Sequence, residues 1–180
     1  MPESTPVHVR NYSAATEDYL KAIYVLHQEH GQVTTSLLSE HLGVAPPSIT
    51  GMFHKLAKLA LVIYRPYQGV TLTHRGECTA LNVLRRHRLL KLFLMQALGY
   101  GREEAHAEAD VLEHVISERL ETRIAAYLGH PAVDPHGDPI PAADSARPTS
   151  RCRLLARLAI GAIGWIAHTT HQHPEIMYAP

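Results

Sequence analysis

Histidines and carboxylates crowd into the stretch HAEADVLEHVISERLETR, residues 106–123. If this stretch is one α-helix, each residue advances by about 100°, and His106, Asp110, Glu113 and His114 fall within an arc of roughly 100°. The spacing therefore predicts one polar stripe. The other side of the same helix is expected to face the core, with the apolar residues Leu112, Val115 and Ile116.

This polar stripe has the composition of part of a metal site. Two neighbouring carboxylates repel each other unless a cation lies between them, and the arc contains no lysine or arginine. Mixed carboxylate and imidazole ligands suit manganese or iron(II), whereas zinc, cobalt or cadmium can take the same ligands in vitro. The alternative is a solvated helix face, on which the carboxylates and histidines only meet water. We expect no enzyme, because the sequence offers no nucleophile and pocket beside the carboxylates.

The bulk composition is typical of a globular protein, with 180 residues of which 46% are apolar and 19% charged. Residues 1–101 hold ten Lys/Arg and six Asp/Glu, whereas residues 102–150 hold four and ten. We therefore expect a basic region that meets an anion and an acidic region that meets a cation. Cys78 and Cys152 have no metal or redox spacing, and the longest apolar run has 14 residues and contains Arg157. These features predict a cytoplasmic protein without a membrane span.

The first part of the chain has the pattern of a winged helix-turn-helix. Residues 13–31 form an amphipathic pattern that Ser13 or Thr16 can cap and that Gly31 ends. Two shorter helical patterns follow, TTSLLSEHLGV and PPSITGMFHKLAKLALV, the second of which begins with prolines. The next stretch, LVIYRPYQGVTLT, has two β-branched and aromatic runs around a Pro and Gly turn, which is typical of a hairpin.

The second part is predicted to be helical. Residues 75–98 and 102–128 form two long amphipathic patterns separated by GYG, and residues 129–150 have the composition of a turn-rich linker. Residues 151–180 alternate like a strand, and we interpret them as the start of a small β domain. The predicted domains are a winged helix-turn-helix at 1–74, a helical metal-binding and dimerisation domain at 75–141, a linker at 142–150 and an incomplete SH3-like segment at 151–180.

Six motifs in this order resemble the diphtheria toxin repressor family of metal-dependent transcriptional regulators. The similarity extends from about residue 15 to residue 141. The family implies a mainly α fold with a winged helix-turn-helix, a helical dimerisation domain and an SH3-like tail, here truncated. The motifs are TEDYLKAIY, VTTSLLSEHLGVAPPSITGMFHKL, GVTLTHRG, RRHRLLKLFL, AEADVLEHVIS and HGDPIP.

The resemblance also implies a set of metal ligands. Those of the primary site correspond to Asp18, Asp110, Glu113 and His114. Asp18 and Asp110 replace the methionine and cysteine of iron-responsive members, so the oxygen-rich set resembles the manganese-responsive branch and favours Mn²⁺ over Fe²⁺. Glu17, beside Asp18 in the sequence, is expected to face solvent.

A second site is implied only in part. His87 matches a histidine that binds metal throughout the family, and His106 matches one at the second site of the iron branch. Lys91 and Lys21 replace the glutamates that complete the second sites of the iron and manganese branches, and an ammonium repels a metal ion. The remaining candidates for ligands of a second metal site lie in the tail, namely His168, His171, Gln172 and His173.

The implied function is that of a homodimeric, metal-activated repressor of metal-homeostasis genes. Its helix-turn-helix would read a palindromic operator in double-stranded DNA through the major groove. A metal-independent winged-helix regulator, whose acidic helix binds a protein partner, is the alternative. Residues at the start of the proline-led helix of the helix-turn-helix, and residues around that helix, are expected to contact bases or phosphates. They are Thr35, Ser36, Pro47, Ser48, Thr50, Gly51, His54, Lys55, Lys58 and Arg65.

Overall fold

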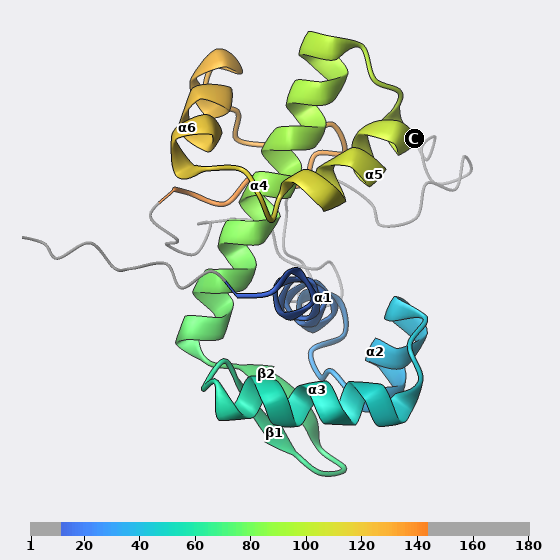
Figure 1. The fold of residues 1–180 in the computed structure, drawn as a ribbon. Helices are drawn as coiled ribbons and strands as arrows, with labels where there is room; N and C mark the ends of the chain where they lie inside the picture. Colours follow the sequence, from blue (N-terminus) through green and yellow to red (C-terminus); the bar gives the residue numbers. More distant parts are fainter. Residues whose placement is uncertain (1–11, 144–180) are drawn as a thin grey trace, which may run out of the picture. The chain divides into compact units, whose positions relative to one another are not determined.

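The computed structural model describes residues 12–143. The chain divides into two compact units, Met1–Leu84 and Arg85–Pro180, and each is described below by itself. Six helices and a two-stranded sheet make up the described part, which is therefore mainly α as expected (Figure 1). None of its helices combines the length and the apolar character that a membrane span requires.

The first unit begins with the expected helix-turn-helix. Helix α1 (Ala14–His30) precedes α2 (Thr35–Leu42) and α3 (Pro46–Lys58). The hydroxyl of Thr34 caps α2 by accepting the backbone N–H of Leu37 at 3.1 Å. Gly43 ends α2 in the left-handed region at φ 64°, and α3 then starts at prolines, which have no N–H to leave unpaired.

The predicted hairpin follows α3 directly. Strands β1 (Val62–Arg65) and β2 (Gly69–Leu72) pair antiparallel, with Val62 opposite Leu72 and Arg65 opposite Gly69. The helices and the hairpin share one apolar core, so this wing packs as part of the unit. The buried residues of that core include Leu20, Ile23, Leu26, Leu38, Ile49, Phe53, Leu56, Leu61 and Val70.

Helix α4 (His74–Leu98) starts against the wing. Its first turn lies so close to the turn between α3 and β1 that a Cβ at Gly76 would be 1.9 Å from the carbonyl oxygen of Leu61. Glycine is therefore required there by packing rather than by a positive φ. Gly51 in α3 is a helical glycine of the opposite kind, because a Cβ there meets nothing within 4 Å.

The two helical glycines should respond oppositely to alanine. We expect Gly76→Ala to destabilise the protein by about 2 kcal/mol or more, because the clash is with backbone that must move. Gly51→Ala should stabilise it by about 0.5–1 kcal/mol, because alanine loses less conformational entropy in a helix. Urea unfolding monitored by circular dichroism measures both, and changes of the same sign in the two variants would contradict this packing.

The second unit contains the rest of α4 together with α5 (Arg102–Leu112) and α6 (Glu118–Tyr127). The prediction of one helix over residues 102–128 is wrong, because α5 ends at Leu112 and a turn follows. Ser117 is extended and starts α6 by accepting the N–H of Leu120 at 3.2 Å, so a capping signal interrupts the apolar pattern. Val115, expected to face the core, is exposed in this turn.

The segment after α6 is folded rather than a plain linker as far as Pro141. Val133 and Pro139 form an isolated antiparallel bridge, and Ile140 is buried in the core of the second unit. Buried polar contacts hold this segment, as described below, and composition alone did not reveal them. The predicted linker at 142–150 lies almost wholly outside the described residues. The SH3-like segment, Cys152 and the four tail residues predicted as ligands lie entirely outside them.

Candidate metal centre and nucleic-acid interface

A cluster of imidazoles and carboxylates surrounds His87 in the second unit. The Nδ1 atom of His87, on α4, is 2.7 Å from Oε2 of Glu113 and 3.2 Å from Oδ1 of Asp110. Its Nε2 atom is 3.3 Å from Nδ1 of His106, and the two rings are nearly perpendicular. Helices α4 and α5 and the turn after α5 thus bring four of the predicted ligands together.

The donor atoms are spaced closely enough for one ion. One ligand atom each from His87, His106 and Asp110 lies within 4.8 Å of the other two. Bonds from a divalent ion to nitrogen or oxygen are about 2.0–2.2 Å long, so a small inward movement of the side chains allows all three to bind the same ion. His106 and Asp110 are also partly open to solvent, so an ion can reach them.

Glu113 is the most buried member of this cluster. Its side chain is 0% exposed, and its Oε1 atom lies 3.5 Å from Nε2 of His114. Burial of an ionised carboxylate is costly unless positive charge or hydrogen bonds compensate for it. Protonated imidazoles or a divalent cation can both provide that compensation, so this donor set fits a metal ion.

Asp18 and Glu17 lie on α1, in the first unit. Asp18 is the fifth residue of the helix and is partly buried. Glu17 is only 7% exposed, so the expectation that it faces solvent is wrong. The helix starts at Ala14, which turns Glu17 inward beside the buried Thr16. The assignment of Asp18 as a ligand remains a prediction.

Lys91 forms a buried ion pair in the second unit. Its ammonium lies 2.9 Å from Oδ2 of Asp134, whose side chain is 0% exposed, and 3.5 Å from Nδ1 of His136. The other carboxylate oxygen of Asp134 accepts the backbone N–H groups of His136 and Asp138 at 2.8 and 3.1 Å. The positive charge of Lys91 is thus matched by a carboxylate, which reduces the repulsion expected for a metal ion.

Three cationic side chains of α4 fix the segment after α6. In addition to Lys91, Arg85 donates to the carbonyl oxygen of Pro141 at 2.6 Å, and Arg88 donates to that of Pro139. Sequence reasoning did not single out Asp134 or His136. The DPHGD pattern contained a local signal, because an aspartate that precedes a turn commonly accepts backbone N–H groups two residues on.

The environment of Asp134 changes its acidity. Burial by itself would raise the pKa of Asp134, but the hydrogen bond and charge of Lys91 act against it, and the resulting pKa lies below its ordinary value of 3.8. The two backbone N–H donors act in the same direction. The carboxylate is therefore held ionised in the folded protein.

This lowered pKa predicts a pH-dependent contribution to stability. Asp134 is protonated at lower pH in the folded chain than in the unfolded chain, so its contribution is fully present above about pH 3.8 and is lost as the pH falls through the folded value. The difference in unfolding free energy between wild type and Asp134→Asn should therefore shrink below that pH in urea titrations. Glu108→Gln, at an exposed position on α5, is the matched control. A difference that stays constant for Asp134→Asn would contradict the assignment.

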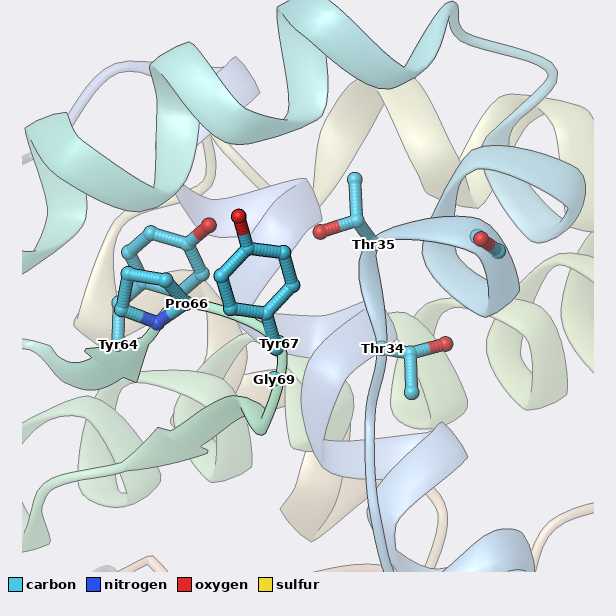
Figure 2. Close-up of a pocket in the computed structure, with 7 residues that line it drawn as sticks. Thr34, Thr35, Tyr64, Pro66, Tyr67 and Gly69 are labelled. Atoms are coloured by element: carbon cyan, nitrogen blue, oxygen red, sulfur yellow. The ribbon is translucent and has the colours of Figure 1, made fainter.

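The residues predicted to contact DNA lie on the first unit. Pro47, Ser48, Gly51, His54 and Lys55 are exposed on α3, and Thr50 is partly buried with its hydroxyl 3.2 Å from the carbonyl oxygen of Pro46. Ser36, Lys58 and Arg65 are exposed, and Thr35 is partly buried. The ring of Tyr64, which also lines the pocket shown in Figure 2, packs edge-on against the exposed His54, with centroids 5.3 Å apart.

Comparison with known proteins agrees with both parts of this description. Residues 11–70 match the family model of the iron dependent repressor N-terminal DNA binding domain, and residues 73–142 match that of the iron dependent repressor metal binding and dimerisation domain. The chain belongs to the iron-dependent repressor family. The predicted family is thus confirmed, and so is the expected combination of a DNA-binding and a helical dimerisation domain. Both models describe parts of a regulator rather than an enzyme.

Relatives of this iron-dependent repressor family member are similar over most of the described residues. An uncharacterised HTH-type transcriptional regulator of Methanocaldococcus jannaschii is 36% identical over 117 residues, which cover 64% of this chain and 94% of the relative. The iron-dependent repressor IdeR of Mycobacterium tuberculosis is 34% identical over 126 residues, or 70% of this chain. The chain spans only 55% of the length of that mycobacterial protein.

Solved structures extend the comparison. A manganese-dependent transcriptional repressor in complex with manganese is 42% identical, has a TM-score of 0.73, and is matched over 90% of this chain and 75% of its own. The manganese regulator SloR is 38% identical with a TM-score of 0.64, over 71% of this chain and 59% of its own. The manganese-activated repressor ScaR, which has been solved with zinc and with cadmium, is 38–39% identical.

Proposed function

We propose that this protein is a metal-activated, DNA-binding transcriptional repressor of metal-homeostasis genes that acts in the cytoplasm as a homodimer. The observation that carries the proposal is the cluster around His87, where Asp110 and Glu113 share one imidazole within 3.2 Å. Such a carboxylate and imidazole set, in a chain of this family, fits a regulatory divalent ion.

Manganese is the proposed activating ion, with iron(II) as the alternative. The proposed primary ligands are Asp18, Asp110, Glu113 and His114, and His87 and His106 are the proposed ligands of a second site. Oxygen and imidazole donors suit manganese, and the set contains no thiolate or thioether that would favour softer ions. The similarity to a manganese-dependent repressor supports this choice. Zinc, cobalt and cadmium are expected to bind in vitro.

The proposed mechanism follows from the positions of these ligands along the sequence. Asp18 belongs to the DNA-binding unit, whereas the other ligands belong to the helical unit. Ligation by both would make the orientation of the DNA-reading helices depend on metal. In a two-fold dimer, two recognition helices spaced by roughly 34 Å would then read a palindromic operator.

Metal-dependent DNA binding is the direct test. A duplex is first enriched from a random pool by the manganese-loaded protein, and its affinity is then measured by fluorescence anisotropy in manganese and in chelator. We expect binding to be about 100-fold tighter in manganese, which corresponds to a coupling free energy of about 2.7 kcal/mol. Equal affinity in the two conditions would contradict metal activation and favour the metal-independent regulator.

Substitution of Asp110 tests the ligand set. Asp110→Ala should abolish the effect of manganese on DNA affinity, because it removes a carboxylate 3.2 Å from His87 and 3.6 Å from His106. The protein should remain a dimer in sedimentation experiments. Glu108→Ala, at an exposed position on the same helix, should keep the manganese response. A normal response in Asp110→Ala would remove this residue from the proposed site, and loss of the dimer would mean that the cluster is structural.

A further inference from the structure

A small pocket adjoins the proposed second metal site in the helical unit. Its volume is about 240 Å³, and it is lined by Arg102, Glu103, His106 and His136. His106 is already a proposed ligand of that site, whereas His136 belongs to the segment after α6. We propose that His136 is a further ligand, so that His87, His106 and His136 form a site of three imidazoles that favours zinc. The inference rests on the proposed function, because it extends the second site named there.

The first two imidazoles have the spacing of neighbouring ligands on one ion. The Nε2 atom of His87 lies 3.3 Å from the Nδ1 atom of His106. Bonds from zinc to imidazole nitrogen are about 2.0–2.1 Å long, so two nitrogens on a tetrahedral ion lie roughly 3.4 Å apart. A tetrahedral ion takes four ligands, and this pair therefore leaves two positions for other donors.

Asp134 holds His136 by both its backbone and its ring. One carboxylate oxygen, Oδ1, accepts the backbone N–H of His136 at 2.8 Å, and the other, Oδ2, lies 3.4 Å from Nδ1 of the ring. Histidines that bind a metal usually donate their second ring N–H to a carboxylate, which fixes the tautomer and the orientation of the ring. We place the proton of the neutral ring on Nδ1 accordingly, which leaves the lone pair of Nε2 for an ion.

Lys91 acts on His136 through Asp134. Its ammonium lies 2.9 Å from Oδ2 of Asp134 and 3.5 Å from Nδ1 of His136, so the carboxylate is its closer partner. Lys91 also helps to hold the pKa of Asp134 below its ordinary value, which keeps the carboxylate ionised and able to accept the ring N–H. Lys91 and Asp134 are thus positioning residues, and the ammonium is neutralised beside the site.

The ring of His136 is accessible although its backbone is fixed. Arg85 and Arg88 of α4 donate to the carbonyl oxygens of Pro141 and Pro139, which holds the segment in place. The side chain of His136 is 31% exposed, so its ring borders solvent at the pocket. An ion can therefore enter through the pocket and meet a ring that only has to rotate.

The proposed donor set differs in chemistry from that of the primary site. Three imidazole nitrogens suit borderline ions such as zinc, whereas an oxygen-rich set suits manganese. The nitrogen-rich site would therefore select a different ion from the primary site within the same chain. Zinc is the probe that tests this assignment.

The test is a zinc titration of the full chain in competition with a chromophoric chelator. The wild type should bind two zinc ions per chain. His136→Gln removes the imidazole and keeps a polar side chain, and it should weaken the second ion by about 100-fold, whereas loss of the orienting carboxylate in Asp134→Asn should weaken it by about tenfold to 100-fold. His130→Asn, at an exposed histidine of the same segment, is the matched control and should bind as the wild type does. Asparagine suits the positive φ of 55° at that position.

A direct measurement separates ligation from a structural role. In protein with ¹⁵N-labelled histidine, the Nε2 resonance that is missing from His136→Gln should shift when the wild type takes up its second zinc ion. Circular dichroism verifies that each variant is folded. A single zinc ion in the wild type, unchanged zinc affinity in His136→Gln, or an unshifted resonance would overturn the inference and leave metal-activated repression intact. Absence of manganese-dependent DNA binding by the wild type, measured separately, would overturn the proposed function.

Discussion

The helical unit depends on the neutralisation of one buried carboxylate. Glu113 has no exposed side-chain surface, and the imidazole of His87 lies 2.7 Å from it. The energetic cost of burying this charge is met only if α4, α5 and the following turn keep their present spacing, because each contributes a member of the cluster. An ion that binds there would act on the same electrostatic balance that holds these elements together. Metal binding at the proposed site would thus be physically linked to the folding of this unit.

Local signals in the sequence were sufficient for most of the fold. Thr34, Gly43 and Pro46 start or end helices by chemistry that involves only their immediate neighbours, and the prolines had already predicted the start of α3. The break after Leu112 was missed because Ser117 competes with an apolar pattern that continues across it. Whether a serine caps a new helix or continues an existing one depends on tertiary packing, which a single sequence does not reveal.

The candidate site was predictable to a lesser extent. The closeness of Asp110 and Glu113 was predicted from their spacing on one continuous helix. In the structure α5 ends at Leu112, between these two residues. His87 entered only through the family resemblance, because it joins the cluster from another helix. The pairing of Lys91 with Asp134 requires a contact between distant segments. The effect of an ammonium on a nearby ion depends on the carboxylate that it already faces, so charge type alone does not decide whether Lys91 opposes a metal ion.

The end of α5 at Leu112 affects the electrostatic potential at the cluster. The carbonyl groups in the last turn of a helix point along its axis and together carry roughly half a negative elementary charge. Glu113 and His114 follow this end directly, so backbone atoms contribute attraction for a cation beside the side-chain donors. A continuous helix through residue 128 would have placed these partial charges more than two turns away. The interruption that separates α5 from α6 would therefore make the peptide backbone itself part of the proposed cation site.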